Sequence, residues 1–114
     1  MFKKISIVVL LCFPFVSHAN FECTGAVSGV TLSPQGAVVV ASLKDWSYQT
    51  ICNVSNQSNG VNPEACKAIY SLLLTAQTTN KTVTFWFNAG DCTAGSQPSW
   101  TALANWYLGP KIND

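Results

Sequence analysis

The chain has 114 residues and a formal net charge of +1, and only 10% of its residues are charged. This length corresponds to a single domain. The basic residues are all lysines, and they do not form the clusters that bind phosphate groups, so we expect no nucleic-acid partner.

Residues 1–19 have the pattern of a secretory signal peptide. Lys3 and Lys4 provide the positive start, residues 5–16 form an apolar run, and Ser17 and Ala19 are small residues at the positions that a signal peptidase needs. The apolar run is too short to span a membrane. We therefore expect a secreted or periplasmic bacterial protein without a membrane span.

The remaining residues, 20–114, contain neither histidine nor arginine. Serine or cysteine nucleophiles therefore lack a histidine base, and a zinc site built on histidine is excluded. The five carboxylates are scattered, without a recognisable pair for glycoside hydrolysis. The composition predicts a protein that is not an enzyme and that has no cofactor and no metal site.

The first half of this region predicts three strands. The first covers residues 24–33 and is followed by a turn at residues 33–36, where Pro34 and Gly36 favour chain reversal. The second strand covers the valine-rich residues 37–43, which makes the pair a hairpin. The third covers residues 46–54, and a polar loop over residues 55–62 follows it.

A helix is predicted after this loop. Asn62 is a suitable N-cap, Pro63 suits the first helical position, and Glu64 favours the positive end of the helix dipole. We expect the helix to end at residues 78–80. Its apolar stripe has helical spacing, with Leu72 widening it: Cys66, Ile69, Tyr70, Leu73 and Ala76.

The last part predicts two more strands. Residues 82–87 alternate, which places Val83, Phe85 and Phe87 on one face and Trp86 on the other. A loop over residues 89–98 leads to a final strand at residues 99–108, and we expect the tail after Pro110 to be frayed. Trp100 and Trp106 are expected to fill the core.

The element order is three strands, one helix and two strands. This order predicts a small β-rich α+β fold, namely an OB-fold-like five-stranded barrel with the helix between strands 3 and 4. Residues 20–114 would form this single domain, cross-linked by disulfides, because a domain of this size buries a small share of its surface.

The cysteines of residues 20–114 allow three disulfide connectivities. We favour Cys52–Cys66, because these residues flank the loop between the third strand and the helix. Cys23–Cys92 then remains, and these residues flank strands that are neighbours in an OB barrel. The spacing contains no Cys-x-x-Cys motif, so we expect structural rather than redox-active bridges.

Several segments resemble the B subunits of subtilase-cytotoxin-like bacterial toxins. The similar segments are residues 22–25, 27–30, 51–52, 65–66, 78–87 and 109–110. The resemblance implies an OB-fold that assembles into a ring, such as a homopentamer, together with a toxin A chain. It departs from the family in three respects. The helix segment after Cys66 is about a dozen residues shorter, Cys23 replaces a tryptophan, and Cys92 lies before the last predicted strand instead of at the tail.

The resemblance also implies a function and a site. Family members bind sialylated glycans, and the serine that contacts the sialic acid carboxylate corresponds to Ser28. Phe87 corresponds to an aromatic residue that lines the sugar site. Trp86 is a further ligand-binding candidate, because it alternates away from the apolar face of its strand.

Two functions therefore remain open. The first is a secreted, non-catalytic glycan-binding protein that resembles a toxin B subunit and recognises sialylated cell-surface sugars. The second is a small, monomeric exported interaction protein, such as an inhibitor or envelope component, that binds a protein partner and no sugar.

Overall fold

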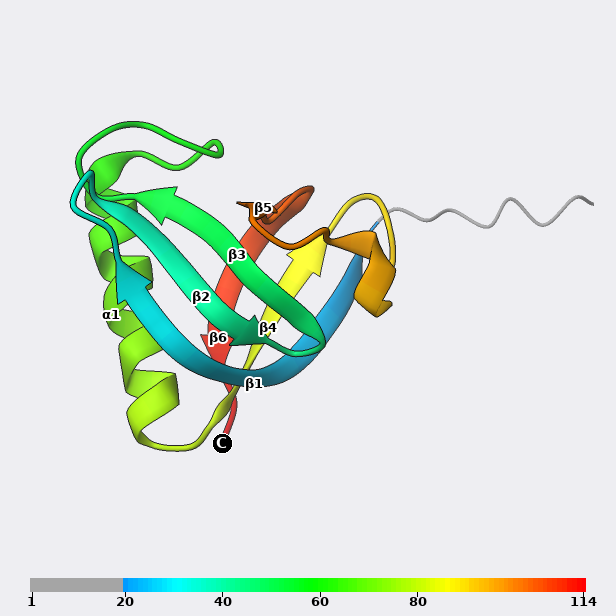
Figure 1. The fold of residues 1–114 in the computed structure, drawn as a ribbon. Helices are drawn as coiled ribbons and strands as arrows, with labels where there is room; N and C mark the ends of the chain where they lie inside the picture. Colours follow the sequence, from blue (N-terminus) through cyan, green and yellow to red (C-terminus); the bar gives the residue numbers. More distant parts are fainter. Residues whose placement is uncertain (1–19) are drawn as a thin grey trace, which may run out of the picture.

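The computed structural model describes residues 20–114, and the predicted signal peptide lies outside the described residues. These residues form one six-stranded sheet that curves into a half-barrel, with a single helix beside it (Figure 1). The strand order is β5-β3-β2-β1-β4-β6. The elements are β1 (Phe21–Leu32), β2 (Ala37–Leu43), β3 (Trp46–Asn53), α1 (Pro63–Thr78), β4 (Thr82–Phe87), the 3-10 helix η1 (Ala94–Ser96), β5 (Thr101–Ala102) and β6 (Trp106–Ile112).

The prediction of five strands is wrong, because the expected last strand is divided in two. Strand β5 contains only two residues and pairs in parallel with β3, whereas β6 pairs with β4 in the antiparallel sense. The expected frayed tail is also wrong, since Ile112 of β6 lies opposite Val83. Pro110 is tolerated within β6 because β6 is an edge strand, where a missing backbone N–H leaves no neighbouring strand unpaired.

The helix follows its sequence signals closely. The Asn62 side chain accepts a hydrogen bond of 2.8 Å from the backbone N–H of Ala65, and the helix begins at Pro63. The buried residues have a spacing of three and four and consist of Cys66, Ile69, Leu73 and Ala76. The expected contribution of Leu72 to this stripe is wrong, because Leu72 lies beside the stripe and is 39% exposed. Within residues 20–114, no helix is long and apolar enough to cross a membrane.

Both predicted disulfides are confirmed. Cys52–Cys66 joins the end of β3 to the first turn of α1, and Cys23–Cys92 joins β1 to the loop after β4. Strands β1 and β4 are neighbours, as the second pairing requires. The core between sheet and helix contains buried residues from β1, β2, β3 and β4, including Val40, Ile51 and Phe85. Strand β6 adds the partly buried Trp106 and Ile112.

Candidate functional site

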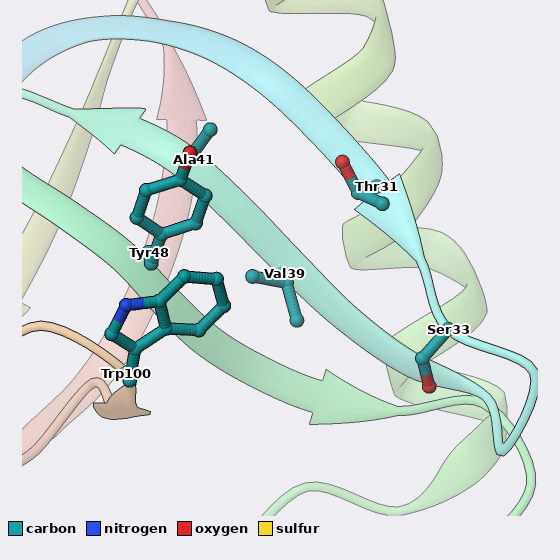
Figure 2. A pocket seen from close by; sticks show the side chains of 6 residues that line it. All are labelled: Thr31, Ser33, Val39, Ala41, Tyr48 and Trp100. Carbon is teal, nitrogen blue, oxygen red and sulfur yellow. The ribbon is translucent and has the colours of Figure 1, made fainter.

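Two aromatic side chains stand out on the outer face of β3. Tyr48 is 41% exposed and Trp100 is 72% exposed, and their rings stack with centroids 4.1 Å apart and planes 8° apart (Figure 2). The prediction that Trp100 fills the core is wrong, because residue 100 belongs to a segment that packs along the edge of β3. Trp106 does pack against the core, with its ring edge-on to Phe85 at 5.2 Å.

The backbone at both aromatic residues is strained. The φ angle is 49° at Tyr48 and 64° at Trp100. Bulky side chains rarely adopt this left-handed region, and each such residue costs on the order of 1–3 kcal/mol. Strain of this kind persists where the surrounding contacts hold it, and it occurs preferentially at functional sites.

The strain at Tyr48 coincides with a slip in the inside–outside alternation of three strands. In a regular strand, one of two consecutive residues points toward the core. This rule fails within each of β1, β2 and β3, where two consecutive residues lie outside the core: residues 28–29, 41–42 and 47–48. Gly29 shows the same left-handed backbone, with a φ of 66°. The slip turns the Tyr48 ring outward.

The segment that carries Trp100, residues 97–104, is anchored to β3. The Trp100 backbone N–H donates to the Tyr48 carbonyl at 2.9 Å, and the Leu103 N–H donates to the Thr50 carbonyl at 2.9 Å. We call residues 97–104 the arm. These bonds fix the indole above the Tyr48 ring.

Two buried glutamines fix the arm through side-chain hydrogen bonds to its backbone, Gln49 from β3 and Gln97 from within the arm itself. The Gln49 side chain is 0% exposed, and its Nε2 donates to the Pro98 carbonyl at 2.9 Å and to the Ser47 carbonyl at 3.0 Å. The Gln97 side chain makes two hydrogen bonds to the backbone of Ala104, at 2.9 and 3.0 Å. The position of Trp100 is therefore determined by buried polar contacts and does not depend on surface packing alone.

A groove of about 250 Å³ runs beside the aromatic pair, across the outer face of β1, β2 and β3 (Figure 2). Its floor is apolar and its lining contains no charged residue. The lining residues are Thr31, Ser33, Val39, Ala41, Tyr48 and Trp100.

The two hydroxyls on the far side of the groove keep free hydrogen-bonding capacity. The Thr31 hydroxyl donates to the Gly29 carbonyl at 3.0 Å, which leaves its oxygen free to accept. The Ser33 oxygen accepts from the Ala37 N–H at 2.9 Å, which leaves its hydrogen free to donate. The groove therefore combines an aromatic wall with one acceptor and one donor opposite it.

Ser28 lies on the same outer face. It is exposed and stands opposite Ser42, which in turn stands opposite Ser47. These three exposed residues form a serine row across the sheet, and Tyr48 follows Ser47 directly. The predicted ligand-binding serine thus shares the outer face with Tyr48 and lies two strands away from it.

The other two predicted site residues lie elsewhere. Trp86 is half-buried and stands opposite Glu22 of β1. Glu22 precedes Ser28 by six residues, so Trp86 lies about 20 Å from Ser28 along the strand, at roughly 3.3 Å per residue. Phe87 is 1% exposed and belongs to the core, where it stacks on Phe21 and meets the edge of Trp46. The structure does not bring Ser28, Trp86 and Phe87 together.

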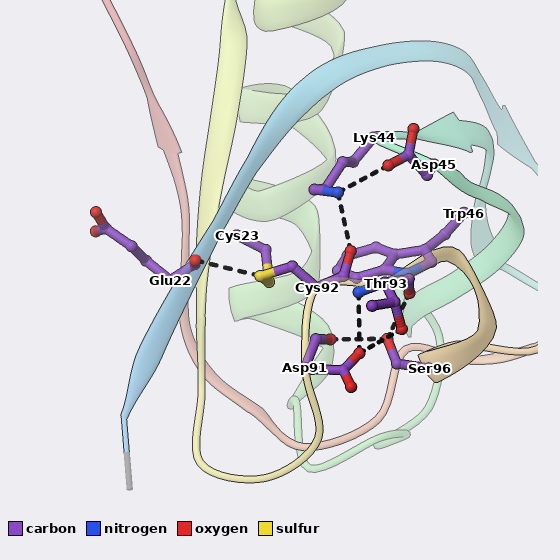
Figure 3. Close-up of polar contacts among 9 residues, drawn as sticks. All are labelled: Glu22, Cys23, Lys44, Asp45, Trp46, Asp91, Cys92, Thr93 and Ser96. Atoms are coloured by element: carbon purple, nitrogen blue, oxygen red, sulfur yellow. Dashed lines mark hydrogen bonds and ion pairs between the residues drawn. A yellow bond between two sulfur atoms is a disulfide. The ribbon is translucent and has the colours of Figure 1, made fainter. Parts of the chain in front are cut away.

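A second polar cluster lies in the loop after β4 (Figure 3). The Lys44 Nζ donates to the Cys92 carbonyl at 2.9 Å and to the Asp45 carboxylate at 2.8 Å, and the Trp46 Nε1 donates to the Thr93 carbonyl at 2.9 Å. With the Cys23–Cys92 disulfide, these contacts fasten the loop to the sheet. We interpret this cluster as a structural anchor.

Asp91 stabilises the turn within this loop. Its carboxylate accepts hydrogen bonds from the side chain and the backbone N–H of Thr93, and these bonds hold the pKa of the Asp91 carboxyl below its usual value. Within residues 20–114, no group of three or more histidine, cysteine or acidic residues is arranged to hold a metal ion.

Sequence reasoning did not select Tyr48 as a site residue, and it expected Trp100 in the core although Trp100 is exposed. For Trp100, the available signal was its polar context, because it stands between Ser99 and Thr101 shortly after Pro98. Comparisons with protein-family models, curated proteins and solved structures found no match for this chain. We therefore base the functional proposal on the chain's own residues and on the resemblance described above.

Proposed function

We propose that this chain is a secreted, non-catalytic glycan-binding protein, similar to a toxin B subunit, that recognises sialylated cell-surface sugars. One observation carries the proposal. The exposed Ser28 hydroxyl shares an outer sheet face with the stacked, exposed pair Tyr48 and Trp100. Hydroxyl donors beside an aromatic ring provide the mixture of polar and apolar contacts that a sugar requires.

In this proposal the serine row binds the carboxylate of the sialic acid. The chain has no arginine, so the carboxylate has to be held by neutral donors, and Ser28, Ser42 and Ser47 offer three exposed hydroxyls in line. Neutral donors give weaker hydrogen bonds than charged ones. The affinity of a single site would be low, and binding to a cell surface would depend on several sites acting together.

Export is part of the proposal. The two disulfides support an oxidising compartment, such as the periplasm or the extracellular medium. The OB-fold assignment is proposed on the element order, since the helix lies between the third and fourth strands and β1 neighbours β4.

Replacing Ser28 by alanine is expected to abolish binding to sialylated glycans without changing stability. The exposed side chain makes no contact that the core needs, and the substitution barely alters volume. A glycan array probed with the purified protein of residues 20–114 measures this effect. Ser71→Ala, an exposed serine on α1, is the matched control and should bind like the parent. Undiminished binding by Ser28→Ala would remove Ser28 from the site.

We further propose that the protein forms a ring-like homo-oligomer, such as a pentamer, which would dock a toxin A chain. Strand β6 supports this, because it is an edge strand whose Tyr107 and Leu108 are 47% and 55% exposed. Trp86 lies opposite Leu108 and extends this apolar surface. An unpaired strand edge with apolar side chains favours contact with another chain.

Light scattering of the purified protein at micromolar concentration is expected to give a mass of several subunits. A protein of one subunit's mass would contradict the ring. The second candidate function, a small exported interaction protein, would then gain support, since the same β6 surface would be free for a different protein partner.

A further inference from the structure

We propose that the groove beside Trp100 is a subsite for a neutral pyranose ring, so that the natural ligand is an oligosaccharide of at least two sugars. The acidic sugar would lie at the serine row and the neutral sugar would stack on the indole. This inference rests on the proposed glycan-binding function and specifies the ligand class that the site takes.

The first argument is the exposure of Trp100. One face of the indole is covered by Tyr48 at 4.1 Å, yet the side chain remains 72% exposed, which leaves its other face open. An apolar ring surface of this size is favourably buried against a flat, apolar partner. The C–H face of a pyranose has this shape, while the hydroxyls on its rim need polar partners.

The second argument is that the indole is held in place before any ligand binds. Gln49 and Gln97 fix the backbone of the arm, and the backbone N–H of Trp100 donates a hydrogen bond to the backbone carbonyl of Tyr48. A preorganised ring loses little conformational freedom on binding, so less of the interaction free energy is lost to ordering the site. This matters for sugars, whose interaction with a single site is weak. Holding the two rings in this position requires the left-handed backbone at Tyr48 and Trp100, and that conformation is strained.

The third argument concerns charge. The six lining residues include no aspartate, glutamate, lysine, arginine or histidine, so a charged ligand would lose hydration in the groove without gaining a partner of opposite charge. Thr31 and Ser33 nevertheless offer one acceptor and one donor, which match the hydroxyls of a neutral sugar.

The size of the groove also suits a small ligand. Its volume of about 250 Å³ is below the range of roughly 300–1,000 Å³ that encloses a larger drug-sized ligand.

The fourth argument is the spacing of the two subsites. Ser28 lies on β1 and Tyr48 on β3, with β2 between them, so the two backbones are about 10 Å apart at roughly 4.8 Å per strand. This separation exceeds one sugar ring. A single oligosaccharide lying across the sheet can therefore reach both Ser28 and Trp100.

Calorimetric titration with three probes tests the inference: free sialic acid, lactose and sialyllactose. We expect sialyllactose to bind the parent protein more tightly than either part does. Trp100→Ala should weaken sialyllactose about tenfold or more and abolish lactose binding, while free sialic acid binding is unchanged. Trp100→Phe should retain part of the affinity. Leu72→Ala removes an exposed apolar side chain of α1 that belongs neither to the groove nor to the β6 surface, and it should have no effect.

The outcomes separate the two proposals. If sialic acid and sialyllactose bind equally and Trp100→Ala changes neither, the neutral subsite is wrong and the proposed function stands. If Trp100→Ala and Leu72→Ala weaken sialyllactose binding alike, the effect is not specific to the groove and the inference is also wrong. If none of the three probes binds the parent protein, both the subsite and the sialylated-glycan function are rejected.

Discussion

Replacing Cys23 and Cys92 together by alanine is expected to lower the free energy of unfolding by roughly 4 kcal/mol. The disulfide closes a loop with a sequence separation of 69, so its removal returns considerable freedom to the unfolded chain. By the same entropic model, Cys52–Cys66 closes a separation of only 14 and contributes about 3 kcal/mol. For a domain of this size, either loss is a large part of the total stability.

Urea unfolding of the two double variants and the parent, followed by tryptophan fluorescence, measures these losses. The Cys52/Cys66 double variant serves as the comparison, because it removes a bridge that leaves the loop after β4 untouched. A loss below about 1 kcal/mol for the Cys23/Cys92 variant would contradict the prediction. It would mean that the contacts of Lys44 and Trp46 hold the loop adequately without the bridge.

The helix and the three long strands β1, β2 and β3 were predictable because their signals are local. An asparagine N-cap followed by proline and glutamate determines where α1 begins, and apolar spacing determines its buried face. The turn between β1 and β2 is equally local, since Pro34 and Gly36 both favour it. The alternation in β4 correctly placed Val83, Phe85 and Phe87 toward the core.

The division of the last strand depends on contacts that are distant in the sequence. Residues 101–102 pair with β3, some fifty residues earlier, and β6 pairs with β4 across the sheet. A continuous run of aromatic and small residues gives no local sign of this change of partner. The Gly109-Pro110 pair was interpreted as a stop, although an edge strand accepts it.

The aromatic pair was missed for a related reason. Tyr48 faces outward only because the alternation of β3 slips, and the left-handed backbone that allows this is uncommon for tyrosine. Gly29 in the interior of β1 was the readable sign of a local irregularity. The exposure of Trp100 follows from the arm's anchorage on Gln49, a contact between residues 49 apart in sequence. Ser28 came from the resemblance alone.

Replacing Phe87 by alanine is expected to lower the free energy of unfolding by about 3–5 kcal/mol. The ring is 1% exposed, stacks on Phe21 at 5.7 Å and meets Trp46 at 5.6 Å, so truncation leaves a cavity that these rigid rings fill poorly. Trp86→Ala, at the next and half-buried position of β4, is the matched control and should cost less. Urea unfolding measures both variants.

Phe87→Leu separates a packing role from the ligand contact that the resemblance implies. Leucine keeps most of the apolar volume, so the variant should remain folded with a smaller loss of stability than alanine causes. Because the ring is enclosed by Phe21 and Trp46, the leucine variant should bind a sialylated array as the parent does. If a stable Phe87→Leu protein loses glycan binding while Trp100→Ala retains it, the sugar site lies at the end of β4, and the outer face of β1, β2 and β3 is not the binding surface.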